Sequence, residues 1–188
     1  MRLADIFTAM NLKPGATAAD IGAGPGWITT RMAAAVGPRG SVYAIDIDTK
    51  RAIPALRKIA REHRNVKVIV GAPGNPKLPV PIGAALMASM YHEVVPREEM
   101  LRNVYAALEP GGRLAVYDIM PLRTASRPRE VQAKNHRLSP AIAEAEFRAA
   151  GFEIVSREDA FADDPDEEES HWLIVCRKPG IRTSGAQD

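Results

Sequence analysis

The chain has 188 residues, with 25 basic and 23 acidic side chains and a formal net charge of +2. This length suits one domain with a sizeable core, and so balanced a charge does not indicate nucleic-acid binding. Cys176 is the only cysteine, so an internal disulfide is excluded, and neither a structural zinc site nor any other metal site is expected.

The sequence carries no signal for a membrane. It contains no run of about 18 apolar residues, which a spanning helix would need. The charged residues Asp5 and Lys13 interrupt the apolar N-terminal stretch, which does not fit a secretory signal peptide. We therefore expect no membrane span, and the single cysteine favours the reducing cytoplasm.

The first half of the chain alternates predicted helices and strands. Apolar spacing predicts helices at residues 3–12, 27–36 and 49–63 and strands at residues 17–21, 41–46, 65–71 and 84–88. Pro54 lies inside the third helix and implies a late start or a kink. Four prolines between residues 72 and 82 exclude a regular helix there, so this segment is expected to be an irregular crossover.

The second half continues the alternation of helices and strands until the last two strands, which have no helix between them. The pattern predicts a helix at 97–108, a turn at 109–112, a strand at 113–119, a loop at 120–138, a helix from Pro140 to Ala150, and strands near 152–158 and 171–177. The last two strands lack a helix between them and are expected to form an antiparallel hairpin around an acidic loop at 163–169.

The predicted fold is therefore an α/β, Rossmann-like doubly wound sheet, mostly parallel, with an antiparallel ending and helices on both faces. We expect one domain over residues 1–178 and a disordered tail at 179–188.

A glycine-rich turn joins the first strand to the following helix. Its residues include Asp20, Gly22, Ala23, Gly24 and Gly26. Glycines let the backbone turn sharply and approach a ligand, and the helix that follows directs its free N–H groups at the same place. The turn therefore predicts a nucleotide-like site.

The spacing of these glycines favours one ligand class. The pattern is Gly-x-Gly-x-Gly, shorter than the Gly-x-Gly-x-x-Gly pattern that suits a pyrophosphate. Asp20 precedes the turn, where its charge would repel a pyrophosphate but would suit a ligand with an ammonium and a sulfonium group. We infer S-adenosylmethionine.

The second predicted strand ends in Asp46, 20 residues after Gly26. A carboxylate at this strand end can accept two hydrogen bonds from the vicinal hydroxyls of a ribose. Ile47 follows and is placed to pack on an adenine face.

The chain resembles the class I S-adenosylmethionine-dependent methyltransferases over roughly residues 5–178. The resemblance rests on the segments at 20–26, 42–48 and 108–114, while 91–94 and 136–140 are similar to a small bacterial group that acts on small molecules or has no assigned substrate. It implies a seven-stranded sheet with an antiparallel seventh strand. It also implies S-adenosylmethionine as cofactor, with S-adenosylhomocysteine as product.

Two departures from the family pattern are present. Members usually carry Gly-Asp-Ala after the third strand, where the acid accepts from the adenine amino group, but here Gly71 is followed by Ala72 and Pro73. The Ala72 backbone and Asn75 are the two candidate substitutes. Many relatives also have an N-terminal cap over the substrate, so the cover here is expected from residues 120–138, from the partner in a homodimer, or not at all.

The candidate chemistry follows the fourth strand. His92 and Glu93 are the candidate catalytic residues, and His92 is interpreted as a general base or substrate contact, or else as a cap of the next helix. Ser89 is assigned to the cofactor and Tyr91 to the substrate wall. His136 is a candidate substrate contact, with a capping role as the alternative.

The sequence thus favours transfer of a methyl group to a small-molecule acceptor by in-line displacement. The alternatives are a nicotinamide-dependent oxidoreductase, against which the glycine spacing and the terminal hairpin argue, and a cofactor-binding protein without transferase activity. The acceptor and its reacting atom do not follow from the sequence.

Overall fold

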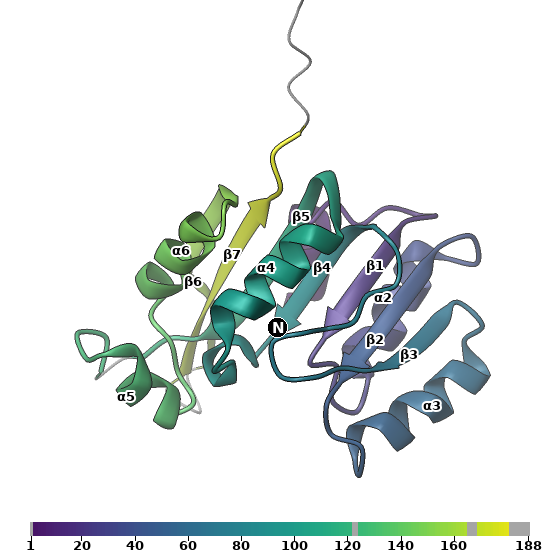
Figure 1. Ribbon diagram of the computed structural model, residues 1–188, viewed down its shortest axis with the longest axis horizontal. Coiled ribbons are helices and arrows are strands. Elements are labelled where there is room, and N and C mark those ends of the chain that lie inside the picture. The colour runs from purple at the N-terminus through teal and green to yellow at the C-terminus, as the bar shows by residue number, and fades with distance from the viewer. Residues whose placement is uncertain (1, 122–123, 165–168, 181–188) are drawn as a thin grey trace, which may run out of the picture.

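The computed structural model describes residues 2–121, 124–164 and 169–180. Its centre is a seven-stranded sheet in the order β3-β2-β1-β4-β5-β7-β6 (Figure 1). The strands are β1 (Thr17–Ile21), β2 (Ser41–Asp46), β3 (Val66–Val70), β4 (Ile82–Ala88), β5 (Leu108–Ile119), β6 (Glu153–Asp164) and β7 (Glu169–Arg177).

Helices cover both faces of this sheet. They are α1 (Leu3–Ala9), α2 (Trp27–Val36), α3 (Ala52–Glu62), α4 (Arg97–Ala107), α5 (Arg129–Lys134) and α6 (Pro140–Ala149), and a short 3₁₀ turn, η1, spans Tyr91–Glu93. The predicted fold class is confirmed, because β1 to β5 pair in parallel and β7 runs antiparallel to both β5 and β6.

Two apolar cores hold the helices against the sheet. On one face, Ile6 of α1, Met32 of α2 and Leu56 of α3 pack on the sheet and are fully or almost fully buried. On the other face, Leu101 of α4 and Phe147 of α6 pack on the opposite sides of the same strands. Such two-sided burial explains the near-continuous apolar character of β1 and β4.

The parallel pairing brings the carboxyl ends of β1, β2, β3 and β4 to one edge of the sheet, where the arrowheads point in Figure 1. The strand order reverses beside β1, since β2 lies on one side and β4 on the other. Ligands of open α/β sheets bind at this edge, outside such a switch point.

Several boundaries differ from those predicted. Residues 109–112 belong to β5 rather than to a separate turn, because Gly111 N donates to Lys178 O and Lys178 N donates to Gly112 O, both at 2.9 Å. Helix α3 starts at Ala52, which leaves Pro54 in its first turn, where a missing N–H costs nothing.

The segment at 120–138 was expected to be a loop, but it contains α5. The predicted acidic loop at 163–169 is shorter than expected, because β6 extends to Asp164 and β7 begins at Glu169. Residues 165–168 of that loop, and residues 181–188 of the expected tail, lie outside the described residues. No helix in the described part of the chain is long and apolar enough to cross a membrane.

Candidate functional site

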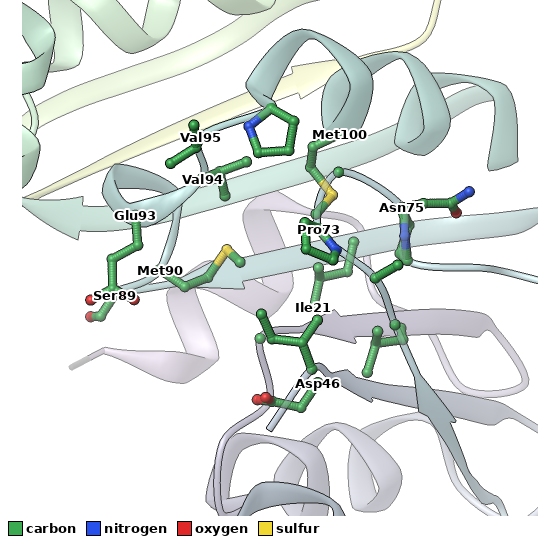
Figure 2. Close-up of a pocket in the computed structure, with 18 residues that line it drawn as sticks. Ile21, Asp46, Pro73, Asn75, Ser89, Met90, Glu93, Val94, Val95 and Met100 are labelled. Carbon is green, nitrogen blue, oxygen red and sulfur yellow. The ribbon is translucent and has the colours of Figure 1, made fainter. Parts of the chain in front are cut away.

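A cavity of about 510 Å³ opens at the carboxyl edge of the sheet, a size typical of small-molecule sites. Its walls come from the ends of β1, β2 and β3, from the loop after β3, and from the segment between β4 and α4 (Figure 2). Most of the lining is apolar. The main carboxylates on it are Asp46 and Glu93, which Figure 2 shows on two different walls.

The three glycines of the turn after β1 all have positive φ angles, but they differ in what surrounds them. Gly22 lines the cavity and adopts φ 73°, and a Cβ there would meet Met90 Cγ at 2.8 Å. Gly24 has φ 53° with open space around it, and its N–H donates to Asp46 Oδ2 at 2.8 Å. Gly26 has φ 87°, and a Cβ there would collide with Leu56 and Ile59 of α3.

Among the predicted cofactor residues of this turn, some line the cavity and others maintain the conformation of the turn. Gly22 faces the cavity. Ala23 is buried, and its N–H donates to Ile45 O at 2.9 Å, while Gly24 and Gly26 lie outside the cavity lining and shape the turn.

Asp46 is the predicted residue with the most defined geometry. Its Oδ2 accepts from Gly24 N at 2.8 Å and its Oδ1 accepts from Asp48 N at 2.9 Å. It also lines the cavity. Each carboxylate oxygen can accept more than one hydrogen bond, so Asp46 can anchor the glycine turn and still accept hydrogen bonds from the hydroxyl groups of a ligand.

Asp20 lies beneath the turn and outside the cavity lining. It is 1% exposed, and its Oδ2 accepts from Thr29 Oγ1 at 2.6 Å. Burial raises the pKa of the Asp20 carboxyl from 3.8 to about 6, against the lowering effect of the Thr29 hydrogen bond and with a further increase from the charge of Asp46.

The predicted adenine side of the cavity is open and mostly apolar. Ile47 lines it and is 59% exposed, so an apolar ligand face would remove this side chain from water. Ala72 and Asn75 also line it. The Ala72 N–H already donates a hydrogen bond to Asn75 O at 2.8 Å, and Asn75 Oδ1 already accepts one from Lys77 N at 2.8 Å.

The segment after β4 forms the opposite wall. Ser89 lines the cavity in a left-handed conformation with φ 52°, and Met90 lies beside it (Figure 2). Tyr91 does not form the predicted substrate wall. It is 0% exposed, packs on Phe147 with ring centroids 5.1 Å apart, and donates its hydroxyl to Glu146 Oε2 at 2.7 Å. Burial, followed by the Glu146 charge, raises the pKa of its hydroxyl.

Glu146 of α6 connects four elements behind this wall. Besides the hydroxyl of Tyr91, it contacts Arg97 Nε of α4 at 2.7 Å and Arg129 Nε of α5 at 2.9 Å, both through Oε1. The Arg129 side chain is 9% exposed. These pairs hold α5 against η1.

His92 lies between the cavity wall and β5. It is 3% exposed, its Nδ1 lies 2.7 Å from Asp118 Oδ1, and its backbone N–H donates to Asp118 Oδ2 at 2.9 Å. Burial by itself would lower the pKa of His92, but the hydrogen bond and charge of Asp118, with the charge of Glu93, raise it above 6.5 overall.

Glu93 lines the cavity, and its carboxylate joins both histidines of the site. Its Oε1 lies 3.7 Å from His92 Nε2 and 3.0 Å from His136 Nδ1. The rings of His92 and His136 meet edge to face with centroids 5.7 Å apart. His136 thus reaches the site from the segment after α5, in a left-handed conformation with φ 54°.

Asp118 is the site residue that sequence reasoning missed. Like Asp20 and Asp46, it is an acidic residue near the carboxyl end of a central strand. Applying to β5 the search for acids at strand ends would therefore have found it. The apolar wall residues Pro73, Val94, Val95 and Met100 carry no comparable sequence signal.

Comparison with known proteins adds sequence relatives. The family model described as "Methyltransferase domain" matches residues 18–112. The chain is 30% identical over 178 residues to an arsenite methyltransferase of Halobacterium salinarum, covering 88% of this chain and 44% of that protein. It is 30% identical over 115 residues to a ubiquinone/menaquinone biosynthesis C-methyltransferase of Ectopseudomonas mendocina, covering 57% of this chain and 43% of that protein. The chain therefore spans less than half the length of both relatives.

The fold also has solved counterparts. A crystal structure of a SAM-dependent methyltransferase from Aquifex aeolicus superposes with a TM-score of 0.74 at 20% sequence identity. That match covers 93% of this chain and 88% of the other.

Proposed function

Because the chain belongs to the class I S-adenosylmethionine-dependent methyltransferases, we propose that it binds S-adenosylmethionine in the cavity at the sheet edge and transfers the methyl group to a small organic acceptor. The reaction is an in-line displacement that releases S-adenosylhomocysteine. The family match also argues against the nicotinamide-dependent alternative.

The observation that carries this proposal is the position of Asp46. Its carboxylate lies on the cavity, is held by two backbone N–H groups, and retains lone pairs for two ribose hydroxyls. We assign Ile47 to one face of the adenine, and Ala72 and Asn75 to its amino edge.

The methionine end of the donor is assigned to the glycine turn and Ser89. Gly22 and Ser89 line adjoining parts of the cavity. Asp20 acts from beneath the turn, where its carboxylate places negative charge behind the site of a cationic ligand.

The acceptor is assigned to the wall made by Met90, Glu93, Val94 and Val95. Methyl transfer from a sulfonium needs alignment above all. Glu93 is the polar group on this wall, and His92 and His136 act through their contacts with it. Their roles as catalytic and substrate-contacting residues stay predictions.

The single cysteine favours an organic acceptor over arsenite. Arsenic(III) is a soft ion that prefers thiolate ligands. Cys176 is 0% exposed, and burial raises the pKa of its thiol. This chain therefore offers arsenite no thiolate at the cavity, whereas the apolar wall suits a carbon skeleton.

Calorimetric titration with S-adenosylhomocysteine tests the donor site. We expect micromolar binding, and about a 100-fold loss of affinity in Asp46→Ala, because two hydrogen bonds to a charged group are removed. Asp5→Ala is the matched control, since Asp5 pairs with Arg2 at 2.6 Å on the surface. Unchanged affinity in Asp46→Ala would contradict the ribose assignment.

A second measurement tests transfer itself. Purified protein with S-adenosylmethionine and a panel of phenols, quinols and amines should release S-adenosylhomocysteine with at least one acceptor. Binding of the donor with no product across the panel would instead favour the cofactor-binding alternative.

A further inference from the structure

Three potential metal ligands converge at the acceptor end of the cavity. They belong to His92, Glu93 and His136, and one ring nitrogen of each histidine and one carboxylate oxygen all lie within 4.8 Å of one another. The atoms that face the Glu93 carboxylate are His92 Nε2 and His136 Nδ1. The Glu93 oxygen is 3.7 Å from the first nitrogen and 3.0 Å from the second. Two imidazoles and one carboxylate thus point at a common volume.

These separations suit a small divalent ion. Zinc lies about 2.0–2.2 Å from nitrogen and carboxylate ligands in a tetrahedral arrangement, which sets neighbouring ligand atoms about 3 to 3.5 Å apart. The two distances from the Glu93 oxygen need only small adjustments, and the ligand nitrogens of the two histidines lie within 4.8 Å of each other. Glu93 and His136 can make these adjustments, because their side chains are 61% and 72% exposed.

The third ligand is already fixed by its surroundings. Asp118 is 0% exposed, and its carboxylate accepts from His92 Nδ1, from the His92 backbone N–H and from Ile119 N. A hydrogen on Nδ1 leaves the lone pair on Nε2, which faces Glu93. A carboxylate behind a histidine is the usual support of a metal-binding imidazole.

The nearby arginine does not oppose a cation here. Arg129 is the cation whose charge acts on His92, but its Nε lies 2.9 Å from Glu146 Oε1. Its charge is therefore paired, while the carboxylates of Glu93 and Asp118 face the histidines.

We propose that His92, Glu93 and His136 bind a divalent first-row transition-metal ion, with zinc as the reference ion, at the acceptor end of the cavity. Imidazole and carboxylate ligands suit zinc, iron(II) or manganese better than calcium or magnesium, which prefer all-oxygen sites. Three protein ligands leave at least one coordination position open, as in catalytic rather than structural sites.

The open position gives the ion a role. Glu93 lines the cavity, so an ion beside it is within reach of an acceptor there. A bound ion would coordinate an acceptor hydroxyl and favour its deprotonated, more nucleophilic form, with the proton passing to the water that reaches the exposed Glu93 side of the site. This role rests on the proposed function, whereas the binding of the ion does not.

The test uses a tag-free form of the 188-residue chain that has been treated with a chelator and dialysed. Calorimetric titration with Zn²⁺ is expected to give one tight site per chain. His136→Ala and Glu93→Gln should each weaken that site at least tenfold, and Asp118→Asn should weaken it 10- to 100-fold through the orientation of His92. His63→Ala is the control, since His63 follows α3 at the opposite edge of the sheet.

Cobalt(II) supplies a readout that a surface ion pair would not give. Visible d–d absorption with the intensity of a four- or five-coordinate ion should appear at one equivalent and vanish in His136→Ala, a change of an exposed side chain that leaves the core intact. Equal zinc affinity in the native chain and in His136→Ala and Glu93→Gln would overturn the proposal, as would an equal loss in His63→Ala.

The same samples separate this proposal from the proposed function. S-adenosylhomocysteine affinity is measured with and without chelator. Retained donor binding with no zinc site overturns the metal proposal alone, whereas a zinc site without donor binding overturns the proposed function alone.

Discussion

The two ends of the cavity are built in different ways. The donor end depends on hydrogen bonds from backbone groups to one side chain, since Gly24 N and Asp48 N both donate to the Asp46 carboxylate. The acceptor end depends on bonds between pairs of side chains, His92 with Asp118 and Tyr91 with Glu146, and the second pair is 55 positions apart in the chain. The donor end is therefore sensitive to backbone changes, and the acceptor end to the loss of single partners.

The largest expected effect is at the donor end. Gly26→Ala should destabilise the protein by about 3 kcal/mol, because it combines a left-handed φ of 87° with a collision against α3. Gly24→Ala is the matched control. It has a φ of 53° but open space, so we expect about 1 kcal/mol. Urea unfolding measures both, and equal losses would show that packing against α3 does not determine the cost.

The second prediction concerns the charge beneath the glycine turn. The Asp20 carboxyl has a pKa of about 6 in the folded protein and its ordinary pKa of 3.8 in the unfolded chain, so it binds its proton more tightly when folded. The free energy of unfolding should therefore be higher at about pH 4 and fall as the pH rises through 6, by about 3 kcal/mol from this residue.

Asp20→Asn isolates this contribution, because an amide oxygen can still accept from Thr29. Relative to the native chain, the variant should gain stability between pH 4 and pH 7 in urea unfolding. Parallel pH profiles for the two proteins would contradict the buried-charge assignment.

The smallest expected effect is at the acceptor end. Glu146→Ala removes the shared partner of Tyr91, Arg97 and Arg129 and should cost about 2 kcal/mol. Because the donor end is built separately, S-adenosylhomocysteine affinity should change less than twofold while transfer slows.

Glu144→Ala is the control on the same helix. Glu144 pairs with Arg148 and Arg157 nearer the surface, so its loss should cost about 0.5 kcal/mol. A large fall in S-adenosylhomocysteine affinity in Glu146→Ala would contradict the claim that the donor and acceptor ends are built independently.

The same contrast explains what the sequence could predict. The parallel sheet class, the terminal antiparallel hairpin and the donor end follow from local patterns, namely apolar strands alternating with helices, the glycine turn and an acid at the tip of β2. The predicted helix at residues 27–36 matches α2 residue for residue. At β5, long-range pairing with the segment after β7 determined the boundary, and no local pattern reports such pairing.

At the acceptor end, contacts between residues far apart in the sequence could not be predicted from local patterns. Tyr91 was expected on the substrate wall, but a carboxylate 55 positions away on α6 holds its hydroxyl in the core. The contact between Glu93 and His136 spans 43 positions and depends on the path of the segment around α5. His92 and Glu93 were identified from their place after β4, whereas the pairing of His92 with Asp118 and of Glu93 with His136 could be found only from the folded chain.

The double use of Asp46 has a kinetic consequence. Its two backbone hydrogen bonds exist before any ligand arrives, and a ribose would occupy lone pairs that these bonds leave open. The nucleoside can then form its hydrogen bonds to Asp46 without breaking either of these backbone bonds. Association should follow a single exponential whose rate rises linearly with ligand concentration, so differences in donor affinity among variants would reside in the dissociation rate.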